Sequence, residues 1–419
     1  MTASNPNRLA RRLGLSDAVV IGLAAMMGAG VFAAIGPAAR VAGSGLLIGL
    51  AIAGVVAYCN ATSSAQLAAI SPESGGTYVF GRQRLGDFWG FIAGWGFIVG
   101  KVASCAAMAL TFGSYVSDRW GRWLAVGAVV ALTSVNYHGV RKTIALTRVI
   151  VGVVLAALLA VVVACLGGGE ASMDNLGSLS GSGGWHAILQ SAGLLFFAFA
   201  GYARISTLGE EVENPARTIP LAVPIALGVT LLVYVAVFGS ALLAVGPVAL
   251  GASQSPLAVA VSAGSLGVVA PVVRVGAAVA SLGVLLSLIV GVSRTVFAMA
   301  SNGELPRRLS AVHPAHQVPH LAELAVGAVV GVLVLAVDVR GAIGFSSFCV
   351  LTYYAITNAA AWTLPPAERR WRRPIAVSGL IGCVVLASTL PRASVAAGSG
   401  VLGIGVAVWF GLSRRSAAS

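Results

Sequence analysis

The chain has 419 residues, of which 58% are hydrophobic and only 9% are charged, whereas a soluble domain carries about 25% charged residues. A soluble protein of this length could not bury so much apolar surface, so most of the chain is expected to lie in a lipid bilayer. The net charge of +13 does not indicate a nucleic-acid-binding protein, because the 26 Lys and Arg residues are spread between hydrophobic runs and form no basic surface.

The cysteines indicate neither a disulfide framework nor a zinc module. All five occur singly, and none belongs to a CxxC pair, which excludes a disulfide framework or a zinc module. We therefore expect no metal and no cofactor. No small-residue cleavage site follows the first apolar run, so we also expect no removable signal peptide.

Apolar runs of membrane length recur along the whole chain. A bilayer crossing takes about 20 residues, and twelve runs meet this need. The predicted fold is therefore an all-α integral membrane protein of about 12 transmembrane helices. The predicted helices are 17–40, 44–70, 86–115, 122–137, 141–167, 185–209, 218–246, 269–301, 320–337, 340–363, 374–391 and 395–412.

Lys and Arg in the short loops predict the orientation. With the N-terminus inside, seventeen of these residues fall on the inner side and six on the outer side. This asymmetry places both termini in the cytoplasm of a multi-pass cell-membrane protein, and two cytoplasmic termini require an even number of helices.

Two of the predicted helices contain an interruption. In the first helix, Gly28-Ala29-Gly30 lies at mid-depth, where each glycine costs about 1 kcal/mol of helix stability relative to alanine. Close approach of another helix is the alternative explanation. In the sixth helix, an apolar segment stops near Gly201, and a polar segment follows from Arg204.

The two interruptions predict an inverted repeat. Ala29 and Gly201 are 172 residues apart, and five helices fall within that distance. Because five is odd, the second copy must be inverted in the membrane, and paired broken helices mark the central site of such transporters. The expected division is 1–14 cytoplasmic N-terminus, 15–168 first repeat, 185–363 second repeat, 374–412 two C-terminal helices, and 413–419 cytoplasmic C-terminus.

Broken helices expose backbone groups that suit a zwitterion. Free N–H groups at a half-helix N-terminus favour an anion such as a carboxylate. Unwound carbonyl groups can receive an ammonium group. An amino acid carries both charges, so two facing interruptions would bind it well.

Five motifs in order along the chain support this interpretation: Gly28–Phe32, Pro72–Tyr78, Asn136–Gly139, Phe196–Pro220 and Arg294–Pro306. With them the chain resembles the amino acid–polyamine–organocation (APC) superfamily of amino-acid permeases, in the bacterial branch that is similar to cationic amino acid transporters. The resemblance covers the first ten helices.

The resemblance implies a substrate site at the two interruptions. The substrate carboxylate would meet backbone amides, the amine would meet backbone carbonyls, and Tyr202 would form a wall or gate of the side-chain pocket. The amides are those of Gly28, Ala29 and Gly30, the carbonyls are those of Met26, Met27, Phe199 and Ala200, and Gly201 completes the substrate-binding set. The Glu210–Pro220 stretch looks like a cytoplasmic hinge.

The sequence departs from the family pattern in two places. Where the family often has Gly-Phe-Glu, this chain has Gly201-Tyr202-Ala203, followed by Arg204. The lysine that some members carry in the fifth helix corresponds to Val154 here, so lysine-based proton coupling does not transfer from the family.

Four residues are candidates for ion coupling: Lys101, Arg204, Ser281 and Ser287. Lys101 lies deep in the third predicted helix, where a charge costs about 2.5–3.5 kcal/mol. It could replace a bound cation, neutralise a substrate carboxylate or lose a proton during the cycle. Arg204 could pair with Glu210 or Glu211 or could contact substrate. The two serines could bind sodium, although a membrane serine usually bonds its own backbone.

Other polar residues have simpler explanations. The spacing of His313, His316 and His320 in one Pro-rich loop suits solvated side chains better than a metal site. Glu304 and the arginines at 369–373 are expected to belong to a lipid-facing charge band at the cytoplasmic surface.

Together these features predict a secondary active transporter that moves amino acids by alternating access, with H⁺ or Na⁺ as the possible coupling ion. The side-chain pocket lacks a carboxylate, so a neutral or apolar substrate is predicted. A membrane amino-acid sensor, or a polyamine or cationic amino acid exchanger on the same fold, remains the alternative. An intramembrane enzyme is disfavoured because the chain has no HExxH motif, and a channel because it has no carbonyl filter motif.

Overall fold

The computed structural model describes residues 13–71, 75–139, 144–177, 183–209 and 211–418, with side chains to residue 413. These residues form helices and contain no strand, only an isolated bridge between Leu13 and Val212. The α-helices are α1 Leu15–Met26, α2 Ala29–Ala42, α3 Leu46–Ile70, α4 Thr77–Leu85, α5 Asp87–Val116, α6 Gly121–Tyr137, α7 Ile144–Gly167, α8 Gly184–Phe199, α9 Ala203–Ser206, α10 Pro215–Ala252, α11 Pro256–Ser262, α12 Ala270–Ser301, α13 His320–Ala336, α14 Val339–Trp362, α15 Arg373–Thr389 and α16 Arg392–Ala418. The 3₁₀ turns are η1 Gly43–Gly45, η2 Met173–Leu176, η3 Ala200–Tyr202, η4 Gly267–Val269 and η5 Arg307–Ser310.

These helices account for all twelve predicted membrane segments, and the all-α prediction is confirmed. Within the described ranges, eight helical segments are long and apolar enough to cross a membrane, and one of them, Ala29–Ile70, joins the end of the first broken helix to α3. The remaining predicted segments correspond to α6, α13 and α15, each of 17 residues. At roughly 1.5 Å per residue, such helices are short for a bilayer crossing.

Two predicted helix ends differ from the structure in an informative way. The seventh segment was expected to end at residue 246, and Gly246 has the left-handed φ of 69°, but α10 resumes after this kink and continues to Ala252. α16 continues to Ala418, past its expected end at residue 412. Part of the terminal segment expected at 413–419 is therefore helical.

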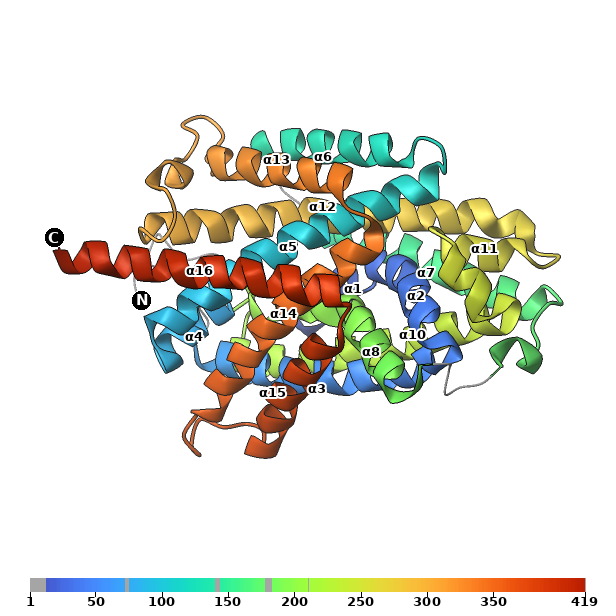
Figure 1. The fold of residues 1–419 in the computed structure, drawn as a ribbon, viewed down its shortest axis with the longest axis horizontal. Helices are drawn as coiled ribbons and strands as arrows, with labels where there is room; N and C mark the ends of the chain where they lie inside the picture. Colours follow the sequence, from blue (N-terminus) through green and yellow to red (C-terminus); the bar gives the residue numbers. More distant parts are fainter. Residues whose placement is uncertain (1–12, 72–74, 140–143, 178–182, 210, 419) are drawn as a thin grey trace.

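The same order of elements occurs twice along the chain. A broken helix, a long helix, a short helix and a second long helix are followed by two further helices, first in α1–α7 and again in α8–α14. The short helices α4 and α11 occupy corresponding places and lie at opposite ends of the molecule (Figure 1). Opposite ends are what an inverted repeat requires, and the division into 15–168 and 185–363 stays a prediction.

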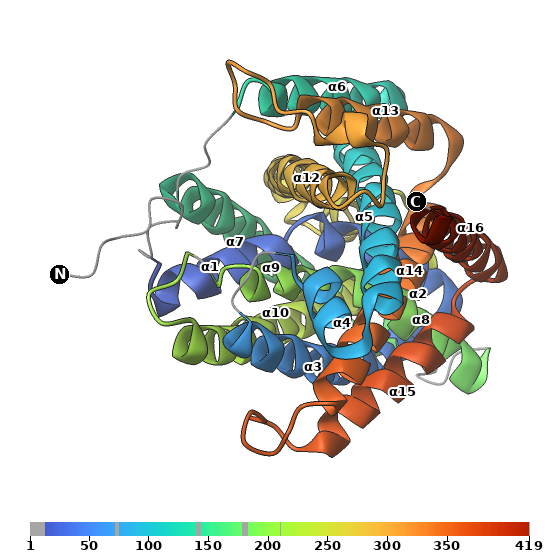
Figure 2. The ribbon, with the colours of Figure 1, turned by 90° about the vertical axis from the view of Figure 1, so that its left-hand side faces the viewer.

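Small residues bring the central helix α5 close to its neighbours. A Cβ atom on Gly94 would lie 2.8 Å from the sulfur of Met299 in α12, and one on Gly100 would lie 2.8 Å from the Cβ of Cys349 in α14. Close packing at glycines is typical of membrane helix bundles. Figure 2 shows α5 running between α12 and α14, so α5 lines the middle of the bundle.

Candidate substrate site at two broken helices

The first interruption lies between α1 and α2. α1 ends at Met26, and Gly28 has an extended backbone with φ −71° and ψ −152° before α2 begins at Ala29. The first amides of a helix have no acceptor within that helix, so the start of α2 presents free donors. Met26, Met27, Gly28, Ala29 and Gly30 are all buried, and the donors are therefore shielded from the surroundings of the protein.

The second interruption lies between α8 and α9. Helix α8 ends at Phe199, the turn η3 follows at Ala200–Tyr202, and α9 is a single turn. After α9, the amide of Glu213 donates to the carbonyl of Leu13, and the amide of Leu13 donates to the carbonyl of Glu211, both at 3.1 Å. The chain leaving the sixth helix is thus held beside the chain entering the first. Glu210, the start of the predicted hinge, lies outside the described residues.

The structure brings the two interruptions together. A Cβ atom on Gly201 would lie 2.3 Å from the carbonyl oxygen of Ala25, and one on Gly30 would lie 2.8 Å from the Cα of Ala198. Only glycine permits such an approach of two backbones. Close approach of another helix therefore explains these glycines, and the approach occurs at the predicted substrate site.

A tyrosine that the sequence analysis did not select connects both broken helices. The hydroxyl of Tyr234, in α10, lies 2.6 Å from the carbonyl oxygen of Met26 and 3.0 Å from that of Ala198. Its ring is fully buried. A buried tyrosine usually finds a partner for its hydroxyl. A tyrosine in the middle of an apolar helix is therefore the sequence signal that could have indicated this contact. In this conformation the hydroxyl of Tyr234 donates to the carbonyl of Met26, which is one of the carbonyls predicted to receive the substrate amine.

Tyr202 faces a second tyrosine. The rings of Tyr202 and Tyr354 of α14 lie 5.0 Å apart, and the hydroxyl of Tyr354 donates to the carbonyl of Ala200 at 3.4 Å. Tyr202 is fully buried. The expected wall residue therefore packs against α14, and a gating role would require this aromatic pair to separate.

Lys101 is buried, with 8% of its surface exposed. It shares one face of α5 with Met108 and Tyr115, because residues seven apart in a helix lie two turns apart. The hydroxyl of Tyr115 donates to the carbonyl of Phe32 in α2 at 3.1 Å, so the Tyr115 end of this face lies against the first broken helix. Within the described residues, Lys101 has no ion pair and no side-chain hydrogen bond.

The other three coupling candidates are engaged locally. Arg204 is exposed, donates to the hydroxyl of Thr207 at 3.1 Å and lies 3.8 Å from a carboxylate oxygen of Glu211. The hydroxyls of Ser281 and Ser287 donate to carbonyls four residues earlier, at 2.7 and 3.1 Å. These contacts agree with the structural explanations given to all three residues.

Glu304 is not part of a lipid-facing charge band, and that expectation is wrong. It is buried, with 7% exposed, accepts a hydrogen bond from Tyr78 at 2.8 Å and forms an ion pair with Arg82. Asn302 also donates to the Tyr78 hydroxyl, at 2.7 Å. Burial raises the pKa of the Glu304 carboxyl, while the hydrogen bond from Tyr78 and the charge of Arg82 act in the opposite direction. The second and fifth sequence motifs meet in this cluster.

A fourth histidine, His138, lies beside the three histidines of the Pro-rich loop. The ring centres of His313 and His316 lie 4.6 Å apart, and His138, from the end of α6, lies 5.2 Å from His316. Desolvation, followed by the charges of the neighbouring histidines, lowers the pKa of His313. No group of three or more His, Cys, Asp or Glu residues in the described chain is placed to hold a metal ion.

Comparison with known proteins agrees with this architecture. The profile of the amino acid permease family matches residues 17–396. An uncharacterized transporter of Mycobacterium tuberculosis is 61% identical over 96% of this chain and 92% of its own length. The branched-chain amino acid permease BcaP of Bacillus subtilis is 29% identical over 76% of this chain and 73% of its own, and human cationic amino acid transporter 4 is 28% identical over 83% and 58%.

The matched region runs from the first turn of α1 into α16, so it contains both broken helices and both copies of the repeated order of elements. The family and these relatives are membrane transporters and not enzymes. The chain belongs to the amino acid permease family of the APC superfamily.

Proposed function

We propose that this protein is a secondary active transporter that carries a neutral or apolar amino acid across the cell membrane by alternating access, with both termini in the cytoplasm. The observation that carries the proposal is the contact between the two interrupted helices. Gly30, at the start of α2, approaches Ala198 in α8, and Gly201, in the 3₁₀ turn Ala200–Tyr202, approaches Ala25 in α1. One group of donors and one group of carbonyls then face the two charges of one amino acid.

The absence of carboxylates near this contact supports a neutral substrate. The two broken helices and the described helices packed on them, α3, α5, α7, α10, α11, α12, α14 and α15, contain only two acidic residues, Asp17 and Asp87. Both lie in the first turn of their helices. A buried cationic side chain without a counter-ion is costly, and Lys101 would repel it further.

Lys101 also supports coupling through α5. The position of the family's fifth-helix lysine is occupied by Val154, which is buried in α7. Lys101 is a buried charged residue on the same face of α5 as Tyr115, which contacts α2. We propose that its charge contributes to coupling, either by standing in for a bound cation or by losing a proton in the cycle.

Uptake by purified protein in sealed proteoliposomes tests the proposal. Labelled leucine, alanine and phenylalanine should accumulate, and a tenfold excess of arginine or putrescine should not compete. Proton and sodium gradients imposed separately would identify the coupling ion. Inhibition by arginine or putrescine without inhibition by neutral amino acids would overturn the neutral substrate. Tight binding without accumulation under any gradient would instead indicate a sensor.

A further inference from the structure

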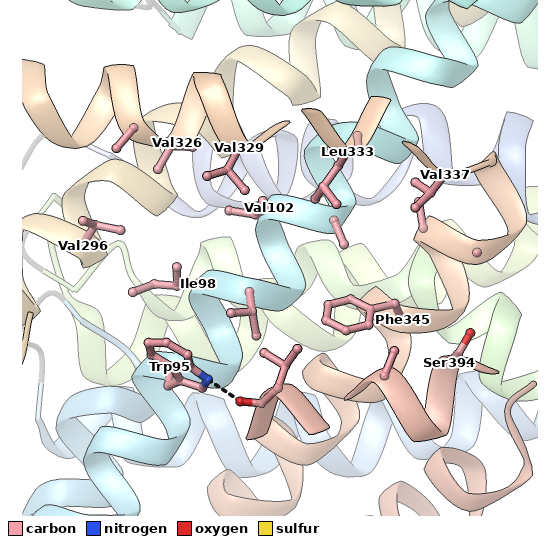
Figure 3. A pocket seen from close by; sticks show the side chains of 18 of the residues that line it. Trp95, Ile98, Val102, Val296, Val326, Val329, Leu333, Val337, Phe345 and Ser394 are labelled. Carbon is pink, nitrogen blue, oxygen red and sulfur yellow. Dashed lines mark hydrogen bonds between the residues drawn. The ribbon is translucent and has the colours of Figure 1, made fainter. Parts of the chain in front are cut away.

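A second apolar site lies on the other side of α5, away from the broken helices. It is a groove with a volume of about 660 Å³ between α5, α12, α13, α14 and α16 (Figure 3). Such a volume falls within the range of about 300–1,000 Å³ typical of ligand sites. On α5 it is lined by Trp95, Ile98, Val99, Val102, Ala103 and Ala106.

The groove has no chemistry for an amino acid. Its lining side chains are apolar except for Ser394, and the indole N–H of Trp95 already donates to the carbonyl of Val401 at 2.9 Å. A zwitterion would therefore lose its hydration and gain no partners. The lining residues of α5 lie on one face of that helix, and Lys101 is not among them. The groove is thus separate from the candidate substrate site.

Its length matches one leaflet of a bilayer. The stripe from Trp95 to Ala106 is roughly 16 Å long at 1.5 Å per residue, about half of the roughly 30 Å hydrocarbon core. Helix α13 borders it on one side and α16 on the other (Figure 3). A groove of this length and polarity fits a single extended hydrocarbon chain.

Two arginines stand at one end of the groove. Leu305 and Leu309 line it, and between them Arg307 and Arg308 are exposed on the turn η5. This is the Trp95 end, because the adjacent Gly94 packs on Met299 near the end of α12. In the described part of the chain, neither arginine forms an ion pair. Arginine binds phosphate in a geometry that lysine does not reproduce.

We propose that the groove binds one acyl chain of an anionic phospholipid, whose phosphate is held by Arg307 and Arg308. The apolar walls exclude a polar occupant, and the paired charges at the mouth select an anionic headgroup over a zwitterionic one. The bound chain fills the space between α13 and α16 and stabilises the packing of the C-terminal helix. This lipid site is independent of the transported substrate.

Native mass spectrometry of detergent-purified protein tests whether Arg307 and Arg308 select an anionic headgroup. Phosphatidylglycerol and phosphatidylcholine with identical acyl chains are added separately, and bound lipid is counted. The wild type should retain one phosphatidylglycerol molecule in preference to phosphatidylcholine. Arg307→Gln with Arg308→Gln should reduce that retention by about tenfold or more, since both basic residues that attract the anionic headgroup are removed. The matched control is Arg372→Gln with Arg373→Gln, another exposed pair, which should retain the lipid.

A second pair of variants tests the groove itself. Ala397 and Ala396 are neighbouring exposed residues of α16, but only Ala397 lines the groove. Ala397→Phe should fill the groove and reduce phosphatidylglycerol retention, while Ala396→Phe should not. Equal retention of both lipids by the wild type, or no effect of either Arg307→Gln with Arg308→Gln or Ala397→Phe, would overturn the proposal. A lipid-free wild-type dimer that Ala397→Phe dissociates would show instead that the groove is an interface between copies.

Discussion

Lys101 and Glu304 are both buried charged residues, but their surroundings differ completely. Glu304, at one end of the bundle, has a hydrogen bond from Tyr78 and an ion pair with Arg82. Lys101, in the middle of α5, has neither within the described residues. A buried charge with partners can serve the fold, whereas an unpaired one lowers stability. We therefore expect Glu304 to serve the fold and Lys101 to serve function.

The two regions are also built from different groups. The centre is made of backbone, where the interruptions of the first and sixth helices touch at Gly201 and Gly30. The cluster around Glu304 is made of side chains from helix α4 and from the loop that follows α12. Substitutions at the centre should therefore act through backbone separation, while those at the cluster should act through lost hydrogen bonds.

The largest effect is expected at Gly201. In Gly201→Val, the new Cβ would lie 2.3 Å from the carbonyl of Ala25, and this backbone contact cannot relax by a rotamer change. We expect loss of uptake and a lower yield of folded protein, measured by proteoliposome uptake and size-exclusion chromatography. Gly228→Val is the control, because a Cβ there meets nothing within 4 Å. Normal uptake by Gly201→Val would show that the two interruptions do not need to touch.

Lys101→Met should separate function from stability. Uptake should fall by about tenfold or more, while the melting temperature stays the same or rises, because an apolar residue of similar volume replaces a buried charge. Lys101→Arg distinguishes the two roles, since arginine keeps its charge but does not release a proton. Unchanged uptake with unchanged pH dependence in Lys101→Met would place this lysine with the structural charges.

Glu304→Gln should show the reverse pattern. Removing the charge weakens the contacts with Tyr78 and Arg82, so the free energy of unfolding should fall by about 1–3 kcal/mol. Uptake per folded molecule should be unchanged. The control is Glu368→Gln, which breaks an exposed ion pair with Arg84 and should cost at most about 1 kcal/mol. A loss of uptake at full stability would make Glu304 a functional residue and break the comparison.

A smaller loss of stability than at Glu304 is expected at Tyr234. Tyr234→Phe removes only the hydroxyl that lies near the carbonyls of Met26 and Ala198, which should cost about 1 kcal/mol. The apparent KM for substrate should change, because a carbonyl predicted to bind the amine becomes free. Tyr58→Phe, on an exposed face of α3, should change neither the melting temperature nor KM.

Much of this protein can be predicted from local sequence. Long apolar runs predict the membrane helices because the bilayer demands a minimum length and internal backbone hydrogen bonding. The glycines at 28 and 30 and the change to polar residues after Gly201 predict the two interruptions, because these are properties of the chain segment itself. The break between α1 and α2 and the turn η3 appear where these signals lie.

Tertiary structure alone decides which distant residues become partners. Nothing in the segment around Glu304 reveals Tyr78, which is 226 residues away, so an apparent surface charge proved to be buried. The approach of Tyr234 to two carbonyls depends on how α10 crosses both broken helices. The groove beside α5 arises from side chains of five helices, and each of their sequences shows only an apolar stripe. Helix packing in a membrane is set by contacts between helices, and these contacts leave no pattern in any single segment.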